Sequence, residues 1–153
     1  MKICYWSMAL LLSLSDAAAA EWSVDSTPIA WADAAEPANG VSARLQVECL
    51  QGVRIASLVI SEDLSAERIG VSFRFDRGSI EHRISPVGTD LRTVILLNVS
   101  SDRLAWGKRF RIVLHPVGTE PLFYEFDLTG SGVAIPQYCA SDALANSGIR
   151  TGG

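Results

Sequence analysis

The chain has 153 residues, of which 48% are hydrophobic and 20% charged, and its formal net charge is −4. This length and hydrophobic fraction suit one domain with a packed core. A mildly acidic chain has no general attraction for nucleic acid or anionic lipid, so neither is expected as a partner.

The first 20 residues have the pattern of a secretory signal peptide. Lys2 provides a positive start, residues 3–14 form an apolar stretch, and Ala18 and Ala20 occupy the small-residue positions of a cleavage site. The apolar stretch is shorter than the roughly 20 residues that cross a bilayer. We therefore expect residues 1–20 to be removed, no transmembrane segment in the mature chain, and a periplasmic or secreted location.

The rest of the chain divides into three parts. Residues 21–40 read as an N-terminal lead-in, in which Trp22 and Trp31 are expected to dock on the body of the domain because an indole buries a large apolar area. Residues 41–140 form the predicted β domain. Residues 141–153 are small and polar, and we expect this tail to be disordered.

Alternation of apolar and polar residues, or short apolar runs, predicts seven strands in the β domain. They cover residues 41–49, 53–60, 69–75, 80–84, 91–97, 108–115 and 122–128. Residues 76–78 are expected to form a tight hairpin turn in which Gly78 adopts positive φ. Ser100 or Ser101 is expected to cap a helical turn that ends at Gly107, and residues 133–139 favour one or two further helical turns.

Seven short strands at intervals of about ten residues, separated by turn residues, predict an all-β fold. Such spacing is typical of an antiparallel β-sandwich or a partly open barrel, here with one or two short helical turns. Long amphipathic helices do not alternate with the strands, which excludes the usual α/β architectures.

The mature chain keeps two of its three cysteines, Cys49 and Cys139, since Cys4 lies in the signal segment. An even number in an oxidising compartment favours one disulfide. Metal binding is the alternative, but two cysteines about 90 residues apart, helped only by His82 and His115, lack the short-range spacing of a zinc site. We therefore predict a Cys49–Cys139 disulfide, no metal site and no cofactor.

The two histidines give little reason to expect catalysis. His82 shares a strand face with Ile80 and Ile84, which predicts a core or edge histidine, and His115 ends a strand. Neither lies near a Gly-x-Ser-x-Gly elbow or another nucleophile motif. The sequence therefore predicts a protein that is not an enzyme.

Arginine supplies eleven of the twelve basic residues of the mature chain. Because arginine binds carboxylates and phosphates with two hydrogen bonds, we take Arg74, Arg109 and Arg111 as a candidate binding surface for an anionic partner. The alternative is ordinary solvated charge, in which Arg109 and Arg111 pair across strands with Glu125 and Asp127.

The order of landmarks resembles a known family. The resemblance rests on Leu45-Gln46-Val47-Glu48-Cys49, Phe73-Arg74-Phe75-Asp76, Ser101-Asp102-Arg103-Leu104, and Phe126-Asp127-Leu128-Thr129-Gly130-Ser131 followed by Cys139. Over residues 41–140 the chain resembles the VasI family, small signal-bearing periplasmic proteins associated with type VI secretion loci. It departs from that family at Ile84-Ser85-Pro86, where such proteins usually carry a tryptophan.

The resemblance implies an exported, non-catalytic accessory domain, whose partner would be another envelope protein or an envelope polymer. A small proteinaceous inhibitor of an envelope enzyme such as a lysozyme is the alternative, because those inhibitors are also compact exported β domains. The Ser-Gly-x-x-Tyr type of loop that we would expect of such an inhibitor is missing from the sequence.

Overall fold

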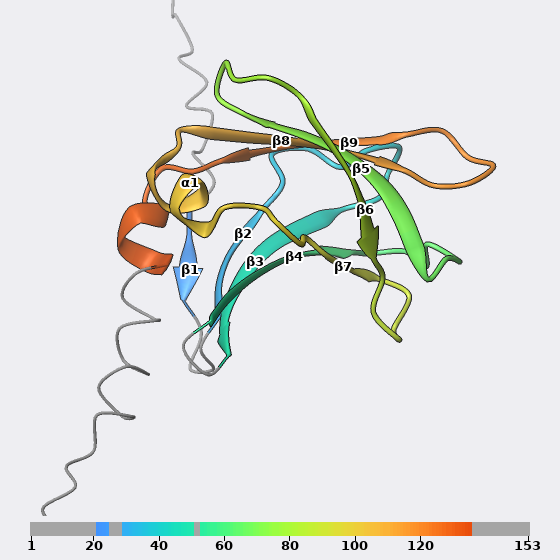
Figure 1. The fold of residues 1–153 in the computed structure, drawn as a ribbon, viewed down its shortest axis with the longest axis horizontal. Helices are drawn as coiled ribbons and strands as arrows, with labels where there is room; N and C mark the ends of the chain where they lie inside the picture. The colour runs from blue at the N-terminus through green and yellow to red at the C-terminus, as the bar shows by residue number, and fades with distance from the viewer. Residues whose placement is uncertain (1–20, 25–28, 51–52, 136–153) are drawn as a thin grey trace, which may run out of the picture.

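The protein is described by a computed structural model that covers residues 21–24, 29–50 and 53–135. One sheet contains, in spatial order, β1 (Ser23–Val24), β2 (Ile29–Asp33), β3 (Ala43–Leu50), β4 (Val53–Ile60) and β7 (Thr93–Ile95). The other contains β6 (Glu81–Pro86), β5 (Arg68–Phe75), β8 (Arg109–His115) and β9 (Leu122–Asp127). All pairs of neighbouring strands are antiparallel. In Figure 1 the second sheet crosses above the first, with α1 (Ser101–Trp106) at one end. The predicted all-β sandwich is confirmed.

The inner faces of the two sheets form one apolar core. Alternate residues of each strand point inward, as the period of two predicted. The largest fully buried side chains include Leu45, Leu58, Phe110, Tyr124 and Phe126. The ring of Phe110 has its centroid 4.8 Å from that of Phe75 and 6.3 Å from that of Phe126, so an aromatic cluster joins three strands of the four-stranded sheet.

The predicted lead-in contains two strands that the sequence pattern did not reveal. β2 pairs with β3 over all five of its residues, and β1 pairs with β2. Ala30 and Ala32 are fully buried by this pairing. Alanine is tolerated both in cores and on surfaces, so an alternation built on it carries little signal.

The lead-in also reaches the other sheet. The indole Nε1 of Trp22 donates a hydrogen bond of 3.1 Å to the carbonyl of Asp127, and the amide of Ala35 donates one of 3.0 Å to the carbonyl of Glu125. Trp22 also packs partly buried against the core, so the predicted docking of this tryptophan is confirmed. These contacts cover part of the outer edge of β9, which would otherwise present unpaired backbone groups.

The hairpin between β5 and β6 differs from the prediction in one detail. Asp76, with φ of 48°, adopts the left-handed conformation, and Gly78 does not. The carboxylate of Asp76 accepts hydrogen bonds from the amides of Lys108 and Arg109, at 3.0 and 2.9 Å. Aspartate tolerates this conformation well, and its side chain here ties the turn to the start of β8.

The short helix α1 has the predicted boundaries. The hydroxyl of Ser100 caps it by accepting a hydrogen bond from the amide of Arg103 at 3.3 Å. A Cβ atom at Gly107, where the helix ends, would lie 2.7 Å from the carbonyl of Arg103, so this position requires glycine. Residues 131–135 are also helical; the remainder of the predicted turns at 133–139 lies outside the described residues. Within the described ranges, no helix combines the length and the apolarity needed to span a membrane.

Tyr124 should make the stability of the fold sensitive to alkaline pH. Burial, with a smaller contribution from the negative charge of Glu62, raises the pKa of Tyr124 to about 12. The unfolded chain loses this proton near pH 10, so the unfolding free energy should fall as the pH rises from about 10 towards about 12. The hydroxyl donates to the carbonyl of Val41 at 3.2 Å.

Urea unfolding of the wild type and of Tyr124→Phe at several alkaline pH values measures this effect. The variant should show a shallower loss of unfolding free energy with pH, because it lacks the titrating hydroxyl. Equal slopes of unfolding free energy against pH for the two proteins would show that Tyr124 does not contribute to the loss of stability at alkaline pH.

Candidate functional site

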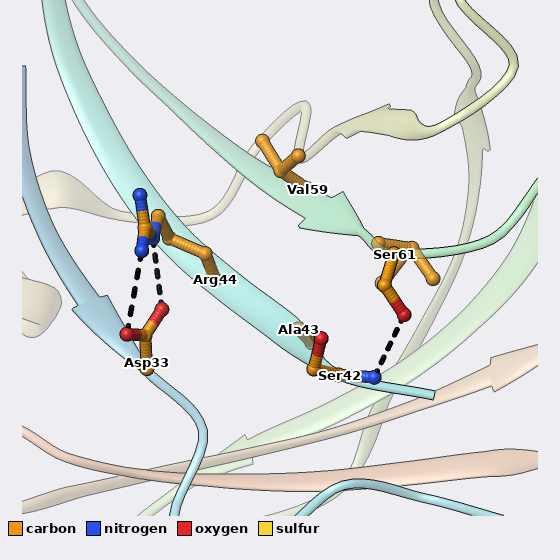
Figure 2. A pocket seen from close by; sticks show the side chains of 7 residues that line it. Asp33, Ser42, Ala43, Arg44, Val59 and Ser61 are labelled. Atoms are coloured by element: carbon orange, nitrogen blue, oxygen red, sulfur yellow. Dashed lines mark hydrogen bonds and ion pairs between the residues drawn. The ribbon is translucent and has the colours of Figure 1, made fainter. Parts of the chain in front are cut away.

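Two adjoining hollows lie where β3 begins and where β2 and β4 end. The first, of about 190 Å³, is lined by Asp33, Ser42, Arg44, Val59 and Ser61 among others; the second, of about 300 Å³, shares three of these residues. Figure 2 shows that their polar groups bond to one another: Arg44 to Asp33 at 2.8 Å, and the amide of Ser42 to the hydroxyl of Ser61 at 3.0 Å. Ligand pockets are usually larger and offer polar groups to the ligand, so we place the functional site elsewhere.

The outer face of the four-stranded sheet brings the three predicted arginines together. Arg74 on β5 is in register with Arg111 on β8, and Arg109 lies two residues earlier on the same face. Glu125 on β9 bonds both β8 arginines, at 3.1 Å to Nε of Arg109 and 2.5 Å to Nε of Arg111. The predicted cross-strand pairing with Glu125 is therefore confirmed for these two; Asp127 instead accepts hydrogen bonds from Thr129.

Arg74 differs from its two neighbours. The residue is half-buried, yet its side chain has no hydrogen bond or ion pair with another described residue. The other described arginines that lack an ion pair are exposed: Arg68, Arg77 and Arg92. The N–H donors of the Arg74 guanidinium are therefore left to solvent or to a group outside these residues.

Both histidines of the chain meet on this same face, around one serine. Ser72 on β5 is in register with His82 on β6, and its hydroxyl lies 2.8 Å from Nδ1 of His82. The hydroxyl also lies 2.8 Å from Nε2 of His115, at the end of β8. Ser72 is 8% exposed, whereas both imidazoles are exposed. Ser72 is a site residue that the sequence analysis did not single out.

The reading of His82 as a core or edge histidine is corrected in part. β6 is indeed an edge strand, but the face that His82 shares with Ile80 and Ile84 points to solvent, and these isoleucines are 58% and 64% exposed. Phe123 on β9 is 53% exposed on the same outer face. Apolar side chains therefore lie on both sides of the polar groups at the centre of this face.

A hydrogen bond between serine and histidine is also the arrangement that activates a catalytic nucleophile. In a catalytic triad, however, a third group orients the imidazole. Neither imidazole has a further hydrogen-bond partner among the described residues, and Ser72 lies within a strand, paired on both sides.

Cys49 lies on β3 with its side chain inward and is 5% exposed. Cys139 lies outside the described residues, so the pairing of these two cysteines stays a prediction.

Comparisons with protein-family models, curated proteins and solved structures found no significant match.

Proposed function

We propose that the chain is an exported, non-catalytic accessory domain that binds an envelope protein through the outer face of its four-stranded sheet. The signal pattern of residues 1–20 supports export, and the resemblance to the VasI family points the same way. We define the outer face by the residues that β5, β6, β8 and β9 direct away from the core: Ser72, Arg74, His82, Ile84, Arg109, Arg111, Val113, His115, Phe123 and Glu125.

The burial of Arg74 and its lack of a described partner are the main support for this proposal. Residue Arg74 is half-buried, and its guanidinium has no carboxylate partner among the described residues. A carboxylate on a partner would complete a bidentate ion pair, which is stronger than a neutral hydrogen bond. Exposed Phe123 and Ile84 on the same face offer apolar area of the kind found at protein interfaces.

We also propose that a disulfide between Cys49 and Cys139 closes the domain. Cys49 is buried and is not a free thiol. Such a bond suits the oxidising compartment that the signal pattern predicts. The intact mass of the mature chain should be lower by about two hydrogens before reduction than after it, and two cysteines that are alkylated without reduction would refute the bond.

Reversing the charge of Arg74 should abolish partner binding. We expect the mature wild-type domain, used as bait in envelope extract, to retain a partner that Arg74→Glu retains at least roughly tenfold less, because a paired charge becomes a repelled one. Arg92→Glu is the matched control: it changes the same charge at an exposed position beside the other sheet. Quantitative mass spectrometry of the three captures measures the effect.

The outcomes separate the alternatives. Equal capture by wild type and Arg74→Glu would refute the outer face as the binding surface. Retention of a muramidase whose activity falls on binding would replace the accessory role with that of an inhibitor. Retention of cell-wall polymer without protein would assign the face to an envelope polymer.

A further inference from the structure

The chain contains only two histidines, and the fold brings both to one point. They lie on β6 and β8, the strands that flank β5, and each has a ring nitrogen 2.8 Å from the hydroxyl oxygen of Ser72. The two nitrogens, Nδ1 of His82 and Nε2 of His115, are therefore at most about 5.6 Å apart, twice that distance. Nothing in the proposed partner binding through Arg74 requires this convergence.

The hydrogen bonds around Ser72 leave the rings adaptable. A serine hydroxyl donates only one hydrogen, so one ring nitrogen accepts from it and the other donates to it. The remaining nitrogens, Nε2 of His82 and Nδ1 of His115, have no partner among the described residues. Solvent can therefore satisfy them in either tautomer. A metal ion bound by both rings would replace their hydrogen bonds to the Ser72 hydroxyl, and each ring could then present a lone pair to the ion.

From this geometry we propose that His82 and His115 together bind one divalent transition-metal ion, Cu²⁺ in preference to Zn²⁺ or Ni²⁺. Imidazole nitrogens bind such ions at about 2.0–2.1 Å, so the two nitrogens must come within about 4 Å of each other. Both rings are exposed and can make this small movement. Gly70 on β5 is paired with His115 on β8. A Cβ atom at Gly70 would lie 3.5 Å from the Cβ of His115, so the lack of a side chain there leaves room beside the imidazole.

The ligand set decides which ion is preferred. Two neutral imidazoles, without a carboxylate or thiolate, suit copper, nickel and zinc and do not suit calcium or magnesium, which prefer oxygen. Among the first three, Cu²⁺ binds a given nitrogen site most tightly. The described residues contain no group of three or more histidine, cysteine, aspartate or glutamate side chains arranged for a metal, so water would complete the coordination and the site is open and exchangeable.

Titration of the mature chain with Cu²⁺ tests the proposal. The protein must carry no polyhistidine tag, so that His82 and His115 are its only imidazoles. We expect one equivalent to bind with nitrogen hyperfine coupling in the electron paramagnetic resonance spectrum. His82→Ala and His115→Ala should each lower the affinity at least roughly tenfold, as expected when half of the protein ligands are lost, and affinity should fall on acidification because protons compete for imidazole.

Two controls make the result decisive. Arg92→Gln, at an exposed position beside the other sheet, should leave the copper titration unchanged. The histidine variants replace exposed side chains and should keep the circular dichroism spectrum and unfolding midpoint of the wild type. Copper binding that is equally strong in the His82→Ala, His115→Ala double variant, or no saturable binding by the wild type, would overturn the proposal.

Discussion

A chain with both Cys49→Ala and Cys139→Ala is expected to lose roughly 4–5 kcal/mol of unfolding free energy, the largest effect of any change considered for this protein. The predicted bond would join Cys49, near the C-terminal end of β3, to Cys139, which lies beyond the last described residue. It would close a loop of about 90 residues. In the chain-entropy account, closing so long a loop restricts the unfolded chain strongly, so its loss mainly favours the unfolded state.

Urea unfolding of three samples measures this effect. The oxidised wild type should unfold at the highest midpoint, while the double variant and the wild type in reductant should unfold at the same, lower midpoint. The single variant Cys139→Ala should match the double variant, since either change removes the bond. A wild-type midpoint that does not move on reduction would contradict the predicted disulfide.

Phe110→Ala is expected to destabilise the fold by about 3–5 kcal/mol. Phe110 is fully buried, and its ring contacts the rings of Phe75 and Phe126, on β5 and β9. Its removal would leave a cavity between the two sheets, which a rigid, close-packed core fills only in part. The loss of aromatic contacts on both sides adds to the lost burial.

Phe123→Ala is the matched control for this prediction. It removes the same side chain from the neighbouring strand, but Phe123 is 53% exposed on the outer face, so the unfolding free energy should change by about 0.5 kcal/mol or less. Comparable losses for the two variants would mean that the inward and outward faces of β8 and β9 are assigned wrongly. The Phe123→Ala protein is also suited to binding assays, because any loss of partner capture would come without loss of fold.

Most strands were predictable because their signal is local. Residues 43–49, 69–75 and 109–115 alternate apolar and polar side chains, and the structure follows that alternation inward and outward. β2 was not predictable in the same way. Its buried residues are Ala30 and Ala32, and alanine is too small and too tolerant to mark a core face until the pairing with β3 covers it.

Alternation along a strand shows which residues share a face. In an edge strand it does not show whether that face points to the core or to solvent. Ile80, His82 and Ile84 alternate as an inward face would, yet they point to solvent. The opposite face of β6 carries Glu81, which forms ion pairs with Arg83 and Arg103 at the margin of the sandwich. An edge strand has a partner on one side only, so charged side chains on its inward face can reach water.

The candidate site was partly within reach of the sequence. Arg109 and Arg111 were predictable as neighbours because they lie two apart on one strand. Arg74 joins them only through the pairing of β5 with β8, which the sequence did not reveal. A hairpin centred near residue 77 also places Ser72 opposite His82, as the structure shows. That hairpin alone gives no reason to bring His115 to the same hydroxyl. The sequence argued against a zinc site because its two cysteines are about 90 residues apart, with only the two histidines to help.

The amino-acid sequence by itself therefore determined the β class of the fold and most strand boundaries, because each depends on residues close together along the chain or on composition. Export and the Cys49–Cys139 disulfide stay predictions from the same sequence. The spatial order β6-β5-β8-β9 was decided only by the tertiary structure. That order depends on how the apolar faces of strands far apart in the sequence pack against one another, and no local pattern encodes this packing. It places the two histidines on either side of Ser72 and leaves the side chain of Arg74 without a partner among the described residues.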